Sequence, residues 1–203
     1  MARIAEAASG EPDYALSIRS AARGLWSAAI DYYDFFDAMT ASIRRGLTRA
    51  WHEGAASAGI EPDELTPEEK LTMENAIVQE WSHVHGFAIW IEANSKARDV
   101  RLGVVLARAA LWAGRYRDVV NLARTKASND PKLKWQLGPT VEHCSTCETK
   151  LDGKVKRASY WTRMGVRPQN PPNDRLECKG WRCACELIPT TEPGSKGPLP
   201  RLP

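Results

Sequence analysis

The sequence predicts a mainly α-helical protein, in which long N-terminal helices precede a small, irregular α+β module rich in cysteine and a flexible proline-rich tail. Apolar residues recur at three- and four-residue spacing through most of residues 13–127, which is typical of amphipathic helices. All five cysteines of the 203-residue chain lie between Cys144 and Cys185, where helical periodicity fades and Pro and Gly become frequent. We therefore divide the chain into a helical region (1–130), a cysteine-rich module (131–189) and a tail (190–203).

The first predicted helix spans roughly residues 13–57. It follows Pro12 and ends before Gly59, and its apolar residues form one continuous amphipathic stripe. Glycine weakens a helix interior, so Gly24 and Gly46 are the positions at which we expect this long stretch to divide into pieces.

The second predicted helix has the clearest start signal in the chain. Thr66 can cap it, Pro67 suits its first position, and Glu69 can complete a capping box. Its apolar pattern continues without interruption to Ile91. The third predicted helix covers roughly Ala97–Ala127 and is ended by an Asn-Asp-Pro sequence.

Short elements are predicted beyond the third helix. Lys134–Leu137 alternates like a strand, and Cys183–Ile188 could form another. Ser159–Met164 could be a short helix that ends at Gly165. The tail after Pro189 is rich in Pro and Gly, and we expect it to be a flexible or extended arm.

Composition favours a folded protein and separates two regions by charge. Hydrophobic residues make up 43% of the chain and charged residues 26%, which excludes wholesale disorder. Residues 131–203 hold 13 Lys and Arg against 7 Asp and Glu, whereas residues 1–130 hold 15 against 18. No stretch reaches the roughly 18 apolar residues of a membrane helix, and no secretory signal is visible. We therefore expect a soluble protein, intracellular where it is made.

The cysteines fall into two groups separated by a long loop. Cys144 and Cys147 form a C-x-x-C pair directly after His143, and a C-x4-C-x-C group follows about thirty residues later. The members of that second group are Cys178, Cys183 and Cys185. Two such groups are typical of a structural zinc site, because one metal then joins two chain segments that have little apolar surface of their own.

Five thiols compete for the four places around a zinc ion, and His143 is a sixth candidate. The C-x-x-C pair is the firmest prediction, whereas the other two ligands could be any two of Cys178, Cys183 and Cys185. An odd number of cysteines excludes complete internal disulfide pairing. The alternative to a metal site is a set of reduced cysteines packed as small hydrophobic residues.

No combination of residues points to catalysis, and we expect that the protein is not an enzyme. The order His-Cys-x-x-Cys differs from the H-x-E and P-C-x-x-C pattern of zinc deaminases. Trp135, Trp161 and Trp181 are expected to form the apolar lining of the module. With nearby basic residues they could instead stack on nucleic acid, so a zinc-ribbon-like nucleic-acid-binding module is the alternative function. Those basic residues are Arg175, Lys179 and Arg182.

The order of the short motifs resembles the C-terminal domain of the phage Mu F-like head-morphogenesis family. That domain has a Trp-bearing strand, a C-x-x-C, an L-x-G turn, an aromatic and Pro-rich loop, and a terminal C-x-C followed by an aliphatic residue. The segments that carry the resemblance are Trp135–Cys147, Leu151–Val155, Tyr160–Trp161, Gly165–Pro168 and Cys178–Leu187. Many family members have His-Pro before the terminal C-x-C, and Cys178 stands in that place here.

The resemblance implies a minor capsid protein of a tailed bacteriophage, with a structural role at the portal or the capsid interior. Its implied partners are portal and/or major capsid proteins, with packaged DNA as a further contact and no membrane association. It also implies several copies per virion, assembly in the host cytoplasm and a final location in the virion head. The helix before the family's module is often rich in Arg and Thr, and the corresponding residues here are Arg115, Asn121, Arg124 and Thr125.

Overall fold

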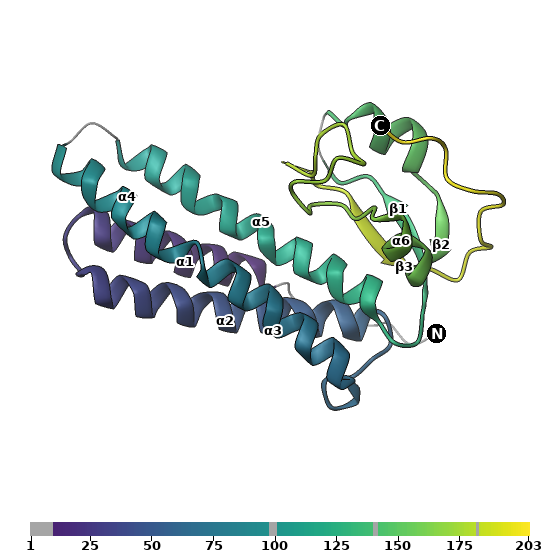
Figure 1. The fold of residues 1–203 in the computed structure, drawn as a ribbon, viewed down its shortest axis with the longest axis horizontal. Helices are drawn as coiled ribbons and strands as arrows, with labels where there is room; N and C mark the ends of the chain where they lie inside the picture. The colour runs from purple at the N-terminus through teal and green to yellow at the C-terminus, as the bar shows by residue number, and fades with distance from the viewer. Residues whose placement is uncertain (1–9, 98–100, 140–141, 182) are drawn as a thin grey trace.

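The computed structural model describes residues 10–97, 101–139, 142–181 and 183–203, and it confirms the predicted fold class. A long helical body carries a small three-stranded sheet and a cysteine cluster at one end (Figure 1). The α-helices of the body are α1 (Glu11–Trp26), α2 (Tyr32–Ser57), α3 (Pro67–Trp81), α4 (Val84–Ala97) and α5 (Leu102–Lys126), with a 3-10 turn η1 (Pro62–Glu64) before α3. In the described part of the chain, no helix is both long and apolar enough to cross a lipid bilayer.

The first predicted helix is divided, but not at either of the expected glycines. The chain turns between α1 and α2, where Ala28 adopts a left-handed φ of 57°. Asp31 then caps α2, because its side chain accepts a hydrogen bond of 2.9 Å from the backbone N–H of Asp34. The capping aspartate, rather than a glycine, therefore marks the boundary.

The second predicted helix is also two helices. The capping box at its start is present, with the backbone N–H of Thr66 donating to Glu69 Oε2 at 2.7 Å. The break falls after Trp81, whose indole Nε1 donates to the carbonyl of Thr40 on α2 at 3.1 Å. Apolar spacing continues across the break into Val84, so hydrophobic periodicity alone could not reveal it.

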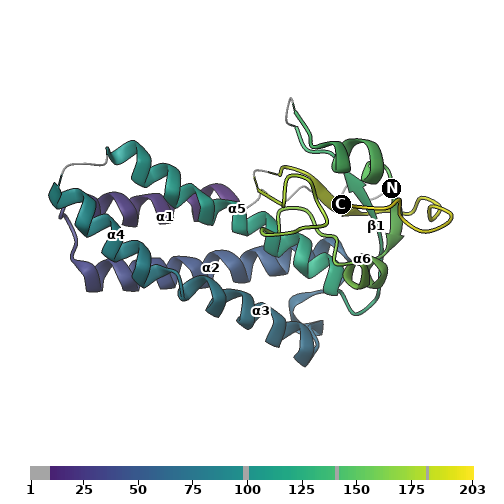
Figure 2. The same cartoon turned by 45° about the horizontal axis from the view of Figure 1, so that its top comes forward.

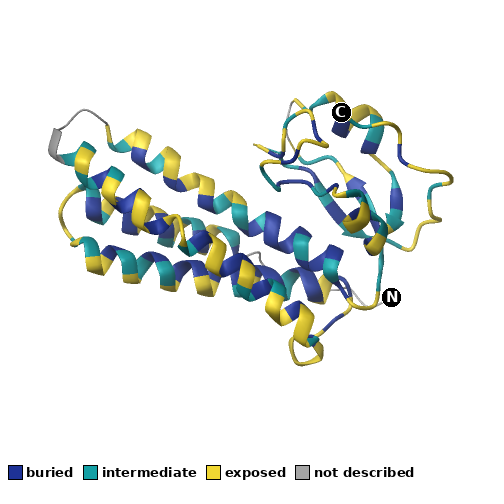
Figure 3. Ribbon diagram, viewed as in Figure 1, coloured by how far each residue is buried: buried dark blue, intermediate teal, exposed yellow. Residues whose placement is uncertain are grey.

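The core of the body lies between closely packed helices, with exposed side chains on their outer faces (Figure 3). α2 packs against α1 and α5 along most of its length, and Phe35, Leu47 and Trp51 are almost fully buried there. Gly54 lies so close to α5 that a Cβ atom would stand 2.4 Å from the carbonyl oxygen of Val120. Glycine at this position is therefore a requirement of helix packing.

The module is built on an antiparallel sheet of order β2-β1-β3. Its elements are β1 (Lys132–Gln136), the π-helical turn η2 (Thr146–Leu151), β2 (Val155–Arg157), α6 (Ala158–Met164) and β3 (Glu186–Pro189). Leu133 and Trp135 point inward from β1, in the alternation that predicted a strand, although β1 begins two residues earlier than expected. Gly165 ends α6 in a left-handed conformation, as predicted, whereas η2 and β2 were not predicted.

The tail, predicted to be a flexible or extended arm, lies against the module without regular secondary structure. Ser195 exchanges hydrogen bonds with Val155, through its backbone N–H at 2.9 Å and its hydroxyl at 3.0 Å. Lys132 and Lys156 donate to backbone carbonyls of the tail, and Leu199 is buried in the core of the module. The basic side chains of the sheet thus hold the tail in place, which local composition does not disclose.

Candidate metal centre

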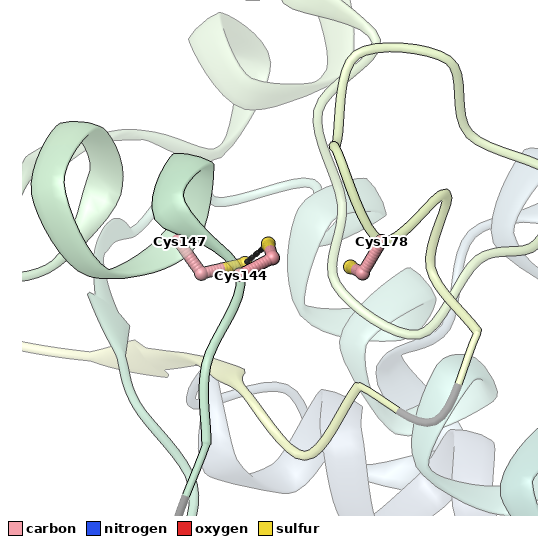
Figure 4. A group of neighbouring side chains, drawn as sticks. All are labelled: Cys144, Cys147 and Cys178. Atoms are coloured by element: carbon pink, nitrogen blue, oxygen red, sulfur yellow. Dashed lines mark hydrogen bonds between the residues drawn. The ribbon is translucent and has the colours of Figure 1, made fainter.

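The first cysteine pair lies on the turn that begins η2. Cys144 is half-buried and lies two residues before η2, whereas Cys147 is buried within η2. The backbone carbonyl of Cys144 accepts a hydrogen bond of 3.0 Å from Glu148, and that of Cys147 accepts one of 2.9 Å from Asp152. The turn places both sulfur atoms on one side, with Cys144 Sγ and Cys147 Sγ 3.3 Å apart (Figure 4).

The second group lies on the irregular segment that leads into β3. Cys178 and Cys183 are half-buried, and Cys185 is buried immediately before the strand. The chain can reverse after Cys178 because Lys179 and Gly180 both have left-handed φ values, of 52° and 79°. The backbone carbonyl of Cys185 accepts a hydrogen bond of 3.1 Å from the side chain of Gln169.

Hydrogen bonds join the two cysteine segments directly. The Glu177 carboxylate accepts a bond of 2.9 Å from the backbone N–H of Ser145, next to Cys144. The backbone N–H of Glu177 in turn donates to the hydroxyl of Thr146 at 3.3 Å. Residues adjacent to Cys144 and Cys178 are therefore joined by hydrogen bonds as well as by their place in the cysteine cluster.

The structure brings all five cysteines into one cluster that can hold a metal ion. The sulfur atoms form two groups, in each of which all atoms lie within 4.8 Å of one another. One group is Cys144, Cys147 and Cys178, and the other is Cys147, Cys183 and Cys185. The sixth candidate, His143, also lies at the cluster, with its Nδ1 atom 3.9 Å from Cys185 Sγ.

Hydrogen bonds among the cysteines shift the pKa values of three of the thiols in different directions. Hydrogen bonds with Cys178 and Cys183 raise the pKa of the Cys147 thiol, and burial raises it further. Hydrogen bonds from Cys147 and Cys183 lower the pKa of Cys185 to about 4, against the effect of burial. Hydrogen bonds from Cys147 and Cys178 likewise lower the pKa of Cys183. The cluster thus favours thiolate at some positions, and thiolate is the form of cysteine that binds metals.

The surroundings of Cys185 suit a buried negative charge. The backbone of Gly138 and the indole of Trp135 both help to lower the pKa of Cys185. The Nε1 atom of Trp135 is buried and makes no other hydrogen bond within the described residues. A Cβ atom on Gly138 would lie 2.0 Å from the carbonyl oxygen of Ala184, so the chain closes tightly over this thiol. N–H donors placed beside a thiol in this way suit the thiolate of a metal site.

A cavity of about 260 Å³ adjoins the sulfur atoms. Its walls include Glu142, His143 and Trp181 besides the cysteines. Trp181 is 51% exposed, so the prediction that it belongs to the apolar lining is wrong. Trp135 and Trp161 do form that lining, since both are fully buried and their ring centroids lie 5.8 Å apart. Of the predicted basic neighbours, Arg182 lies outside the described residues.

The cysteine cluster is fixed to the helical body through β3 and α5, which lie side by side in Figures 1 and 2. The side-chain oxygen of Asn121 accepts a hydrogen bond of 2.9 Å from the backbone N–H of Leu187, two residues after Cys185. Arg124 donates to the carbonyl of Leu187 at 3.0 Å and pairs with Glu186 at 3.3 Å. The Arg/Thr-rich part of α5 therefore holds the strand that follows the last cysteine.

Sequence reasoning missed the residues that support the cluster. Glu177, Gly138 and Gln169 act through contacts with distant parts of the chain, and no local pattern distinguishes Glu177 or Gln169. Only Gly138 carried a usable signal, because Gly-Pro directly after a predicted strand marks a turn.

Comparison of the chain with protein-family models, with curated proteins and with solved structures gave no match. The function must therefore be argued from the module itself.

Proposed function

We propose that the protein is a minor structural component of the head of a tailed bacteriophage, located at the portal or the capsid interior. The observation that carries this proposal is the order of motifs in the cysteine-rich module. Each motif has a structural task that supports the proposal. Trp135 and Trp161 fill the core, Gly153 makes the L-x-G turn with a φ of 70°, and Cys147 and Cys185 meet in the cluster.

A structural zinc ion is the second part of the proposal. The cysteines of η2 and those before β3 would hold it, and the ion would supply a rigid link between two segments separated by about thirty residues. The buried N–H groups beside Cys185 support this choice, because they would stabilise a coordinated thiolate. The role proposed for the metal is structural and not catalytic.

The outer surface of the body supports contacts with portal or major capsid proteins. Large apolar side chains are exposed on all five α-helices of the body, where a partner could cover them. They are Leu16 on α1, Tyr33 on α2, Leu71 and Val78 on α3, Ile89 on α4, and Val104 and Leu111 on α5. The body could thus offer apolar contacts to a partner in the head.

The proposal is tested on particles of the phage that encodes the protein. Mass spectrometry of purified heads should find the chain at low copy, and it should co-purify with the portal or the major capsid protein. A phage that carries Cys147→Ser should assemble fewer infectious particles, whereas one that carries the exposed Thr149→Ala should assemble normally. Absence of the chain from both mature particles and assembly intermediates would reject the proposal.

Nucleic-acid binding is the second candidate function, and the exposure of Trp181 favours it. Lys179 is exposed two residues before this indole in the chain, so a base could stack there beside positive charge. Binding of single-stranded DNA should then weaken steeply with salt and be lost in Trp181→Ala. Binding that is undetectable at low salt, or unchanged by this substitution, would reject it.

A further inference from the structure

The five sulfur atoms are not arranged around a single point. A tetrahedral zinc ion with four thiolates requires sulfur atoms about 3.8 Å from one another, given Zn–S bonds of about 2.3 Å. Among the described residues, each group of mutually close sulfur atoms has three members, with a limit of 4.8 Å. The two groups share Cys147, so this buried thiol lies between the other four, and Cys178 of one group also contacts Cys183 of the other.

We infer that the cluster binds two thiophilic divalent ions, such as Zn²⁺ or Cd²⁺, with the Cys147 thiolate as a bridging ligand. The first ion would be held by Cys144, Cys147 and Cys178, and the second by Cys147, Cys183 and Cys185. This arrangement uses all five cysteines, so none is left over. The inference deepens the proposed zinc site and rests on that part of the proposed function.

The structure offers a candidate ligand for the fourth coordination place of each ion. The Nδ1 atom of His143 lies 3.9 Å from Cys185 Sγ, a separation close to that of two ligands on one tetrahedral ion. His143 is therefore the candidate for the fourth place on the second ion, although its ring must move closer to bind, because its nitrogens do not lie within 4.8 Å of all three sulfur atoms of that group. The first ion can take water as its fourth ligand, because the cavity of about 260 Å³ beside the cysteines has room for it.

Charge also favours two ions over one. Five thiolates with two divalent cations leave a single net negative charge, whereas five thiolates with one cation leave three. Because Cys147 and Cys185 are buried, the larger uncompensated charge would carry a larger desolvation cost. A single ion would therefore require the fifth cysteine to stay protonated or to leave the cluster.

The stoichiometry is measured on the full chain, purified under reducing conditions and loaded with Zn²⁺. Native mass spectrometry should find two ions per chain. After exchange with ¹¹³Cd²⁺, NMR should give two cadmium resonances with a mutual coupling through the shared sulfur. One ion per chain would overturn this inference and leave the structural zinc site intact. No bound metal would overturn both.

Cysteine variants test the bridge. Cys144→Ser and Cys185→Ser should each lower the count from two ions to one, and Cys147→Ser should remove both. Thr149→Ala, an exposed change in the same turn, should keep two. If Cys144→Ser or Cys185→Ser leaves the count unchanged, the altered thiol is not a ligand and the bridged arrangement is wrong. The cadmium spectrum of the unaltered chain decides the question even if a variant fails to fold.

Discussion

The helical body and the cysteine-rich module are held together by different means. In the described chain, the core of the body contains thirty buried apolar residues drawn from all of its α-helices. The core of the module contains eleven buried residues, and two of these are cysteines. Because the apolar area removed from water sets the main stabilising term, the body can fold by burial alone, whereas the module needs additional links.

Those links are of two kinds in the module. Hydrogen bonds from Glu177 and Gln169 position its loops, and the thiols supply a place for metal. The helices of the body are also joined by hydrogen bonds and ion pairs, such as Trp81 to Thr40 and Arg115 to Glu80, but they already bury a continuous apolar stripe along their length. The comparison predicts that the two regions respond differently to the same treatment.

Metal removal should separate the two regions most strongly. Metal is expected to contribute on the order of 10 kcal/mol to a small domain that folds around it. A chelator added to reduced protein should therefore unfold the module and expose Trp135 and Trp161, while the helical circular dichroism of the body persists. Tryptophan fluorescence and far-ultraviolet spectra of one sample measure both. Loss of both signals together, or of neither, would contradict the contrast between the regions.

The second prediction concerns the carboxylate that joins the regions. Asp118 on α5 is 1% exposed and pairs with Arg115 at 3.0 Å and with Arg167 of the module at 2.9 Å. Arg115 also pairs with Glu80 on α3 at 2.7 Å. Burial alone would lower the pKa of Arg115, but the charges of Asp118 and Glu80 outweigh it and raise that pKa.

Asp118→Asn should cost about 3 kcal/mol of unfolding free energy, because two half-buried guanidinium groups lose their shared, fully buried partner. Urea unfolding monitored by fluorescence and by circular dichroism should then give two separate transitions in place of coincident ones. The exposed Asp63→Asn in η1 is the matched control and should change stability by less than about 0.5 kcal/mol. An equal effect of both substitutions would show that Asp118 does not join the regions.

The sequence allowed the body to be predicted in outline, because each of its elements leaves a local signal. The spacing of apolar residues located the helices, and Thr66 with Glu69 located the start of α3. The break after Trp81 could not be located in this way, since it depends on the bond from that indole to Thr40 on α2. The start of α2 could have been predicted from Asp31, because aspartate is favoured at helix N-caps, but we expected the helix to divide at a glycine instead.

The sequence allowed the cysteines of the candidate site to be predicted, but not the residues that hold the cysteine segments in position. The spacing of the cysteines indicated that they would meet, because metal ligands come in recognisable groups. Glu177 and Asn121 support the site through contacts 32 and 66 residues apart in sequence, and such pairings leave no periodic trace. The lysines that hold the tail are invisible for the same reason.

The third prediction tests how closely the body is packed. Gly54→Ala would place a methyl group against the backbone of Val120, so α2 and α5 must separate or the helices must shift. We expect a loss of about 2 kcal/mol in unfolding free energy. Gly114→Ala, in an open position on α5, should instead gain up to about 1 kcal/mol from helix propensity. Opposite signs in thermal unfolding would confirm close packing, and equal gains would contradict it.

The smallest expected effect lies at Glu69, where the body meets the module. Its Oε2 atom accepts a bond of 2.7 Å from the backbone of Thr66, and its Oε1 atom accepts one of 3.0 Å from Ser128, in the turn before β1. Burial raises the pKa of Glu69, but the bonds from Thr66 and Ser128 outweigh it and lower the pKa below the ordinary value of 4.5. The charged carboxylate is therefore the stabilising form.

A carboxyl group with a lowered folded-state pKa stabilises the protein above its unfolded pKa and loses that contribution as the pH falls through the folded pKa. Glu69→Gln should therefore cost about 1 kcal/mol at neutral pH, and this difference should shrink in acid below pH 4.5. Glu68→Gln, an exposed change in the same turn, should show a smaller and flatter difference. A Glu69→Gln difference that stays constant from neutral to acidic pH would mean that the carboxylate charge does not stabilise this junction, and that packing alone joins the body to the module there.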